Sequence, residues 1–463
     1  MIDSSAARQP DAPRLPLSGC VGTILGLVFS TALLAAPVIE GPIPGQPPGD
    51  PQSANLHDTY PFFATQGELM WRGYVEEEFY LSGTATGYST TGEVLAEDVP
   101  YMTRIVVRKP RSKFHFNGTV VMEWQNVTAG YDLDALWHGE QLTRAGFAWV
   151  GVSAQRVGVD QLRDWSPTRY GELDVTGGGQ YNADELSYDI FAQAAQAVRE
   201  GGSVDPMSGL KVSKVLAVGG SQSAGRMTIY YDHILPQIES PVFDGYNFVV
   251  GSAPTREGRE PVFHVLSETD VRSPVRRPDS KVYRRWEVAG AAHSGYQGQA
   301  YRTPLSERDL PQGAPQYDCL KEPFSRVPLH YVVVAAHTHL VRWIDGKQPP
   351  RAPYLEFDGD VKVRNELGLA QGGIQLPQVE APTAINTGDN AGELFCFLFG
   401  SYEPLDNRQL NELYRNHGQY VSKVTKSVAR NVARGYMLPA DGLRDVAEAA
   451  RSDVGKRGWK PGR

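Results

Sequence analysis

The alternation of short apolar runs with helix-like segments constrains the fold of this chain more than any other feature. The runs at 118–124 and 148–153 are short and apolar, as strands buried on both faces are, and further runs typical of strands lie at 212–218, 243–250, 261–266 and 285–288. Segments with helical spacing, 133–145 and 184–199, separate the first three runs. Strands that alternate with helices in this way pack as a parallel sheet covered on both faces, so the fold class is α/β.

The segments on either side of these runs have different patterns of apolar and polar residues. Residues 74–81 and 102–108 alternate between apolar and polar side chains, which predicts antiparallel, half-exposed strands in an N-terminal β extension over 37–110. Residues 407–450 show helical spacing, which predicts a helical C-terminal elaboration over 346–463. A length of 463 residues would allow about three domains. We instead expect one decorated α/β domain over 37–463.

The first 36 residues do not resemble the rest of the chain. Arg8 and Arg14 precede an uncharged stretch over 17–36, which is typical of a signal peptide or an N-terminal anchor. We therefore favour export to the periplasm or the medium. The alternative is an unprocessed start that packs on the domain of a cytoplasmic protein. No later apolar run is long enough to span a membrane, so membrane contact is expected only through this segment, if it is retained.

Charge and cysteine content exclude several classes of protein. With 45 Lys and Arg against 53 Asp and Glu, the net charge is −8, which argues against a nucleic-acid binder with a basic face. Three cysteines cannot form a disulfide framework. Cys319 and Cys396 could form one disulfide in an oxidising compartment, or they could be two buried thiols. His337 and His339, two residues apart on an expected helix, are poorly placed to share a metal ion.

A serine-containing turn follows the strand at 212–218. Its residues are Gly219-Gly220-Ser221-Gln222-Ser223-Ala224-Gly225, and a helical segment comes next. Strand, tight turn of small residues and helix form the context of a nucleophile elbow. Ser221 comes two residues after the glycine that ends the buried strand, so we expect it to be the nucleophile, and Ser223 remains the alternative. A phosphate-binding loop would need the Gly-Lys-Ser/Thr that this turn lacks.

Candidates for the other members of a catalytic triad follow the next two strands. Glu268 and Asp270 come directly after the run at 261–266, and His293 lies in a small-residue loop after 285–288. Hydrolases with a nucleophile elbow have the chain order serine, acid, histidine. His293 would be the base that takes the serine proton, and the acid would fix its tautomer. We favour Asp270 over Glu268 because it lies farther beyond the strand end.

An acyl-transfer site also needs backbone N–H donors for the oxyanion. We expect one from Gln222, the residue after the nucleophile, and one from Asn126 or Val127 in the loop after 118–124. We also expect 160–165 and 177–181, which follow a strand end, to shape the substrate pocket.

Several further motifs resemble those of one bacterial family, the alpha/beta hydrolase domain-containing proteins. The likeness spans about residues 38–450 and rests on Gly41-Pro42-Ile43-Pro44-Gly45, Glu77-Glu78-Phe79-Tyr80-Leu81-Ser82-Gly83-Thr84-Ala85, Ser221-Gln222-Ser223, Ser267-Glu268-Thr269-Asp270, Glu287-Val288-Ala289-Gly290-Ala291-Ala292-His293, Trp343-Ile344-Asp345-Gly346-Lys347-Gln348-Pro349-Pro350 and Gly372-Gly373-Ile374-Gln375-Leu376-Pro377. The resemblance implies an alpha/beta-hydrolase fold and a serine ester hydrolase. Many members have Gly-x-Ser-Gln-Ser-Gly-Arg, whereas here Ala224 is an extra residue before Gly225-Arg226, which bears on the choice between Ser221 and Ser223.

Together these features predict a carboxylic-ester hydrolase that acts on a small-molecule ester through an acyl-enzyme. We expect no cofactor, no metal and no nucleic-acid partner. Two alternatives remain open: an acyltransferase with the same triad, and a non-catalytic binding protein on a hydrolase scaffold.

Overall fold

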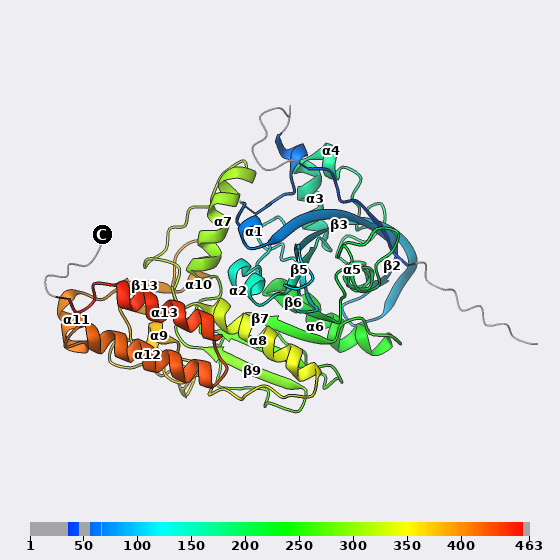
Figure 1. Cartoon of the computed structure of the whole chain (residues 1–463). Coiled ribbons are helices and arrows are strands. Elements are labelled where there is room, and N and C mark those ends of the chain that lie inside the picture. Colours follow the sequence, from blue (N-terminus) through cyan, green and yellow to red (C-terminus); the bar gives the residue numbers. More distant parts are fainter. Residues whose placement is uncertain (1–35, 46–55, 66, 457–463) are drawn as a thin grey trace, which may run out of the picture. The chain divides into compact units, whose positions relative to one another are not determined.

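A nine-stranded sheet forms the centre of the computed structural model, which describes residues 36–45, 56–65 and 67–456 (Figure 1). The strand order is β1-β2-β3-β5-β4-β6-β7-β8-β9. The strands are β1 (Val38–Glu40), β2 (Tyr74–Tyr88), β3 (Val94–Pro110), β4 (Thr119–Trp124), β5 (Ala148–Val152), β6 (Lys214–Gly220), β7 (Gly245–Val249), β8 (Val262–Ser267) and β9 (Tyr283–Val288). In this order, every neighbouring pair from β5 to β9 is parallel. The pairs β1–β2, β2–β3 and β3–β5 are antiparallel. The prediction of a mostly parallel sheet with an antiparallel start is confirmed.

The apolar runs are continuous because each central strand contributes to two cores, one on each face of the sheet. On β4, Val120 and Met122 pack into one core and Val121 into the other. The same alternation holds on β6, where Ala217 and Leu216 face opposite cores. Because both faces are dry, the side chains of both strands are mostly apolar.

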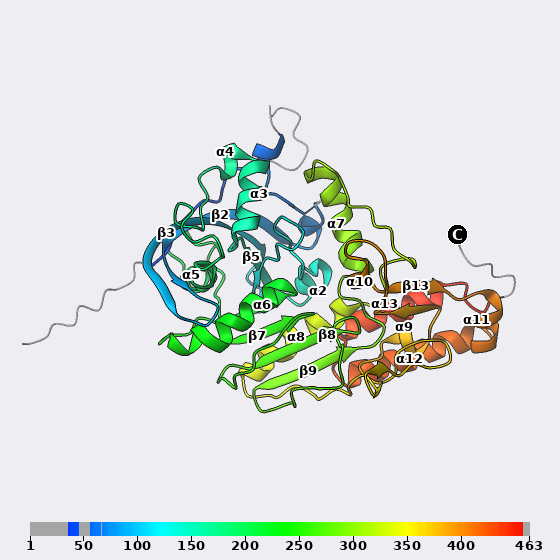
Figure 2. The same ribbon diagram turned by 180° about the vertical axis from the view of Figure 1, so that it is seen from behind.

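Helices cover both faces, as Figures 1 and 2 show from opposite sides. Buried side chains of α3 (Arg156–Trp165), α5 (Ser187–Glu200) and α6 (Gln222–Ile229) belong to the first core. Those of α2 (Gly139–Arg144) and α8 (Leu329–Ile344) belong to the second. Short helices α1 (Glu68–Trp71) and α4 (Pro167–Tyr170) and the longer α7 (Tyr296–Asp309) complete this part of the chain.

The helix expected over 133–145 is shorter in the structure, where α2 begins only at Gly139. Two buried groups hold the preceding residues in a loop. Glu123 Oε1 accepts the Leu136 N–H at 2.9 Å, and Arg108 Nη1 donates to Asp134 Oδ2 at 2.7 Å. These tertiary bonds replace the first turns of the helix, and helical spacing alone could not reveal them.

The strands at the antiparallel end are longer than expected. Strand β3 extends from Val94, well before the predicted start at residue 102, and pairs with β2 along most of its length. Residues 94–98 are mostly exposed, so they carry no apolar alternation to mark them as a strand.

In the C-terminal part, residues 407–451 are mostly helical, as their spacing predicts, whereas residues 346–406 are mostly loop and contain two small antiparallel sheets. Its elements are β10 (Phe357–Asp358), β11 (Val361–Lys362), α9 (Pro377–Glu380), β12 (Ala384–Thr387), α10 (Cys396–Phe399), β13 (Ser401–Pro404), α11 (Asn407–Leu413), α12 (His417–Ala433) and α13 (Pro439–Arg451). The described residues all belong to one compact unit that starts at Ala36.

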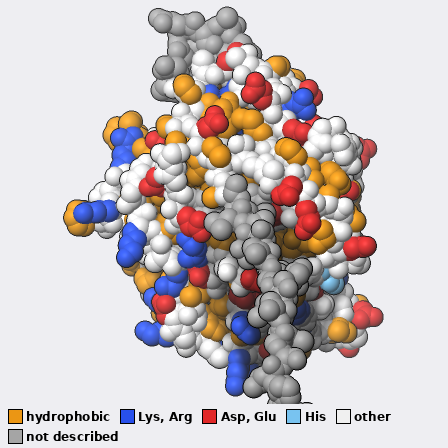
Figure 3. Space-filling view, turned by 90° about the vertical axis from the view of Figure 1, so that its right-hand side faces the viewer, with side chains coloured by type: hydrophobic (Ala, Val, Ile, Leu, Met, Phe, Trp, Pro, Cys, Tyr) orange, Lys and Arg blue, Asp and Glu red, His pale blue; other side chains and the backbone are white. Residues whose placement is uncertain are grey.

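The expected signal peptide or anchor covers residues 1–36. All of these except Ala36 lie outside the residues that the structure describes. Within the part of the chain that the structure describes, no helix is long and apolar enough to cross a membrane. The face shown in Figure 3 carries side chains of both charges.

Candidate active site

Ser221 lies in a sharp turn between β6 and α6. Its φ of 57° and ψ of −117° are unusual for a residue with a side chain, and such a conformation costs about 1–3 kcal/mol. The turn also requires a close approach of strand and helix at Gly219, since a Cβ there would lie 2.9 Å from the Ser223 carbonyl oxygen. This is the strained strand–turn–helix geometry of a nucleophile elbow.

Ser223 is fully buried, and its hydroxyl is engaged within the same turn. Its Oγ donates to the Gly220 carbonyl at 2.9 Å and accepts the Gly220 N–H at 3.0 Å. Ser221 instead lines a cavity. Of the two serines, Ser221 lines the cavity and Ser223 closes the turn.

His293 and Asp270 are hydrogen-bonded to each other. The His293 Nδ1 and Asp270 Oδ1 atoms are 2.7 Å apart, and both side chains are only about one-tenth exposed. The second oxygen of Asp270 accepts the Ser267 hydroxyl at 2.5 Å. The Nδ1 contact leaves Nε2 as the ring nitrogen available for proton transfer, and His293 lines the same cavity as Ser221.

Glu268 is fully buried, and the bonds recorded for it lead elsewhere. Its Oε1 lies 2.7 Å from Arg364 Nη2, and its Oε2 accepts the Gly290 N–H at 2.6 Å. Glu268 therefore joins the end of β8 to the loop after β9 and to the C-terminal part. Asp270 is the carboxylate that contacts the histidine.

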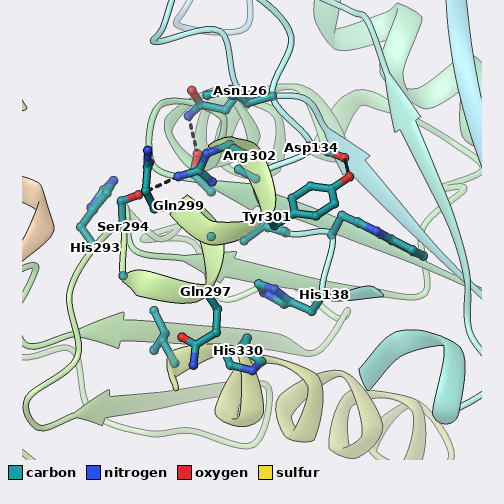
Figure 4. A pocket seen from close by; sticks show the side chains of 18 of the residues that line it. Asn126, Asp134, His138, His293, Ser294, Gln297, Gln299, Tyr301, Arg302 and His330 are labelled. Atoms are coloured by element: carbon teal, nitrogen blue, oxygen red, sulfur yellow. Dashed lines mark hydrogen bonds between the residues drawn. The ribbon is translucent and has the colours of Figure 1, made fainter. Parts of the chain in front are cut away.

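The three residues expected to provide oxyanion donors differ in their surroundings. Asn126 lines the cavity, and its Nδ2 donates to the Gly220 carbonyl at 2.9 Å (Figure 4). Its backbone N–H is directed to the Leu133 carbonyl at 3.3 Å. Gln222 is the first residue of α6, where a backbone N–H has no intrahelical partner. Among the described residues, no acceptor is recorded for the Val127 N–H.

The cavity has a volume of about 500 Å³ and opens at the carboxyl ends of the parallel strands. Sites in open α/β sheets lie at this edge. Its wall combines the loop after β4, the ends of β6 and β7, the His293 loop, the first turns of α7 and α8, residues 394–399 and Arg444.

Most of this wall was not predicted. Residues 160–165 and 177–181, expected to shape the pocket, are absent from its lining, since 160–165 form part of α3 in the first core. The side chains of His138, Tyr301, Arg302 and His330 do line it (Figure 4). Tyr301 and Arg302 come within nine residues of His293 in the sequence, which is the one signal that could have placed them near the site.

Several wall residues carry shifted pKa values because they are buried. Desolvation, with a contribution from the charge of Arg302, lowers the pKa of His138 to about 3. Burial also lowers the pKa of His330, whose ring lies 5.7 Å from that of His138. Both rings are therefore neutral at pH 7. Behind the wall, burial raises the pKa of Glu123 to about 8.

Cys319 and Cys396 form a disulfide with Cα atoms 5.4 Å apart. The bond links the segment that contains Tyr317 to helix α10, and both flank the cavity. No group of three or more His, Cys, Asp or Glu side chains in the described residues is arranged to hold a metal ion.

Known proteins were compared with the chain at the level of sequence family and of structure. The model of the alpha/beta hydrolase domain family matches residues 39–447. No curated protein matches the sequence.

Solved structures are similar over part of the chain. The esterase Est22 is 10% identical with a TM-score of 0.28, and the match covers 43% of this chain and 66% of that one. A putative dienelactone hydrolase from Klebsiella pneumoniae subsp. pneumoniae is 12% identical, with a TM-score of 0.24 over 43% and 74% of the two chains. An α/β serine hydrolase without a lid from Xanthomonas campestris is 14% identical, with a TM-score of 0.23 over 40% and 71%. The chain thus spans just under two thirds of the esterase. Because the family match covers most of its length, this chain has the alpha/beta hydrolase fold and belongs to the alpha/beta hydrolase domain family.

Proposed function

We propose that this chain is a carboxylic-ester hydrolase that acts on small-molecule esters through an acyl-enzyme on Ser221. The observation that carries the proposal is that one cavity is lined both by the strained Ser221 and by His293, whose other nitrogen is held by Asp270. A nucleophile, a base and a group that orients the base are the parts that acyl transfer requires.

In the first half-reaction, His293 Nε2 takes the proton from Ser221 Oγ as that oxygen attacks the ester carbonyl. Asp270 holds the Nδ1 proton and stabilises the imidazolium that forms. The Gln222 N–H, with a donor from the Asn126–Val127 loop, stabilises the negative oxygen of the tetrahedral intermediate. His293 then gives its proton to the leaving alcohol.

In the second half-reaction, the same groups act on water. His293 takes a proton from water as the water oxygen attacks the acyl-enzyme, and returns that proton to Ser221 Oγ when the acid leaves. The net reaction consumes one water and yields one acid and one alcohol.

The test is hydrolysis of p-nitrophenyl esters by wild type, Ser221→Ala and Ser223→Ala. The Ser221 variant should lose about 10⁴-fold or more in kcat, as other serine hydrolases do without the nucleophile. Ser223→Ala should remain active and lose about 1 kcal/mol of stability with its turn hydrogen bonds.

Each other outcome has a definite meaning. An active Ser221→Ala would refute the nucleophile assignment. A wild type that neither hydrolyses esters nor reacts with a fluorophosphonate would favour a binding protein. An added alcohol that yields ester faster than acid appears would favour an acyltransferase.

The disulfide between Cys319 and Cys396 supports a second part of the proposal, that the chain works in an oxidising compartment after export. Mass spectrometry of the mature N-terminus would test this part: a cleaved N-terminal segment is expected, and an intact Met1 in the native host would contradict signal-peptide cleavage.

A further inference from the structure

Arg302 is a cationic side chain in the wall of the cavity that contains Ser221 and His293. It lies in the second turn of α7, and its Nη2 donates to Ser294 Oγ at 2.9 Å (Figure 4). Ser294 directly follows His293, so the guanidinium is anchored next to the loop that carries the proposed base. Within the described residues, no carboxylate forms an ion pair with Arg302.

Other charges in the cavity wall have partners. Glu140 pairs with both Arg72 and Arg444, which are lining cations like Arg302. Asp134 is engaged by Arg108 Nη1 at 2.7 Å and by the Tyr301 hydroxyl at 2.6 Å.

The lining carboxylate for which no ion pair is recorded within the described residues is Glu68, which is exposed to solvent. Glu68, Asp134 and Glu140 are the carboxylates of the wall, and Arg302 is paired with none of them. Arg302 is therefore the lining arginine with no ion pair in the part of the chain that the structure describes, so its charge is available to a ligand.

The guanidinium also has a space made for it. It folds back one turn along α7 onto Gly298, where a Cβ would lie 3.1 Å from Nη1 and 3.6 Å from Cζ. A side chain at position 298 would push the guanidinium away. Ser294 occupies one of the five N–H donors of Arg302, and the planar fork that remains matches the two oxygens of a carboxylate.

The neighbouring histidines do not compete for an anion. His138 and His330 are neutral at pH 7, because burial and nearby positive charge lower their pKa values. The two histidines thus add no positive charge beside Arg302 at pH 7. The His138 Nε2 atom is buried and has no hydrogen-bond partner among the described residues.

We propose that Arg302 binds a free carboxylate carried by the substrate, so that the enzyme hydrolyses half-esters: small esters that bear a second, ionised carboxyl group. This inference rests on the proposed ester hydrolysis and names its substrate class. Water adds across the ester bond as above, and the second carboxylate takes no part in bond making.

The test compares monoethyl glutarate with ethyl pentanoate, which has the same acyl chain length but no second carboxylate, and repeats the comparison for the succinate and adipate half-esters. Hydrolysis is followed by titration of the released acid. Wild type should have the higher kcat/KM for the half-ester. Arg302→Met should lower the ratio of the two kcat/KM values about 10- to 100-fold, the range for a hydrogen-bonded ion pair.

Two further variants control the comparison. Arg302→Lys keeps the charge but not the fork, and should recover part of the ratio. Arg259→Met makes the same charge change at an exposed position outside the cavity lining, and should leave the ratio as in wild type. A merely structural Arg302 would instead slow both substrates equally and leave the ratio unchanged, which would overturn the inference.

Direct binding separates this inference from the proposed function. Calorimetry with glutarate and Ser221→Ala measures recognition of the anion without catalysis. Binding that is lost in Ser221→Ala/Arg302→Met supports the role of Arg302 even if no ester is hydrolysed. Failure of glutarate, succinate and adipate to bind, with neutral esters still hydrolysed by wild type, would overturn the inference and leave the proposed function intact.

Discussion

Asparagine at position 270 should abolish most of the activity while the protein stays folded. Asp270 contacts two groups: Oδ2 accepts the Ser267 hydroxyl at 2.5 Å, and Oδ1 lies 2.7 Å from His293 Nδ1. In Asp270→Asn, the amide oxygen suits the Ser267 hydroxyl, which turns the amide NH₂ toward Nδ1. Nδ1 must then be an acceptor, so the proton moves to Nε2 and the ring can no longer accept the Ser221 proton.

This reversal of tautomer costs about 10⁴-fold in kcat in a serine protease triad, which corresponds to about 5.5 kcal/mol of barrier. We expect a loss of similar size here. The free energy of unfolding should change by about 1 kcal/mol, because both hydrogen-bonding positions remain filled.

Glu268→Gln is the matched variant and should show the opposite pattern. It removes one buried charge from the contacts with Arg364 Nη2 and the Gly290 N–H, 2.7 and 2.6 Å away. We expect a loss of about 1–3 kcal/mol in stability and a change of less than about tenfold in kcat.

The assay is the initial rate of p-nitrophenyl butyrate hydrolysis with urea unfolding of each variant. An inactive Glu268→Gln together with a fully active Asp270→Asn would refute the reasoning, because it would make Glu268 the triad acid.

Two further predictions concern stability. Cys319 and Cys396 close a loop of 77 residues, so a Cys319→Ser/Cys396→Ser variant should lose up to about 4.5 kcal/mol in urea unfolding under oxidising conditions; an unchanged midpoint would contradict this. Burial raises the pKa of Glu123 from 4.5 to about 8, so between pH 5 and 7 the folded protein keeps a proton that the unfolded chain releases. The free energy of unfolding should therefore fall as pH rises over this range, by up to about 1.4 kcal/mol per pH unit. Glu123→Gln should remove that slope, so parallel unfolding free energies of the two proteins over this range would contradict it.

The sequence predicted the sheet well where strands are buried on both faces and poorly where they are not. Strands β4 and β6 appear as mostly apolar runs because they contribute to two dry cores. The exposed start of β3 has no such pattern. Helix α2 is shorter than its periodicity suggests because buried Glu123 and Arg108 bind the residues before it.

Part of the candidate site was predicted from the sequence, and part was not. Ser221, Asp270 and His293 were found from the sequence because each follows the end of a predicted strand, and such ends meet at one edge of a parallel sheet. Their catalytic roles stay predictions. The cavity wall could not be foreseen, because His138 and His330 meet only through the packing of distant segments.

The central claim is that Ser221 is the nucleophile, and covalent labelling tests it most directly. A fluorophosphonate should add one equivalent to the wild-type protein. Trypsin should release the modified residues 215–226, which contain both Ser221 and Ser223, and tandem mass spectrometry distinguishes the two. We expect the label on Ser221 of the wild type and no label on Ser221→Ala. A label on Ser223, or no label on a protein that hydrolyses esters, would contradict the assignment of Ser221 as nucleophile.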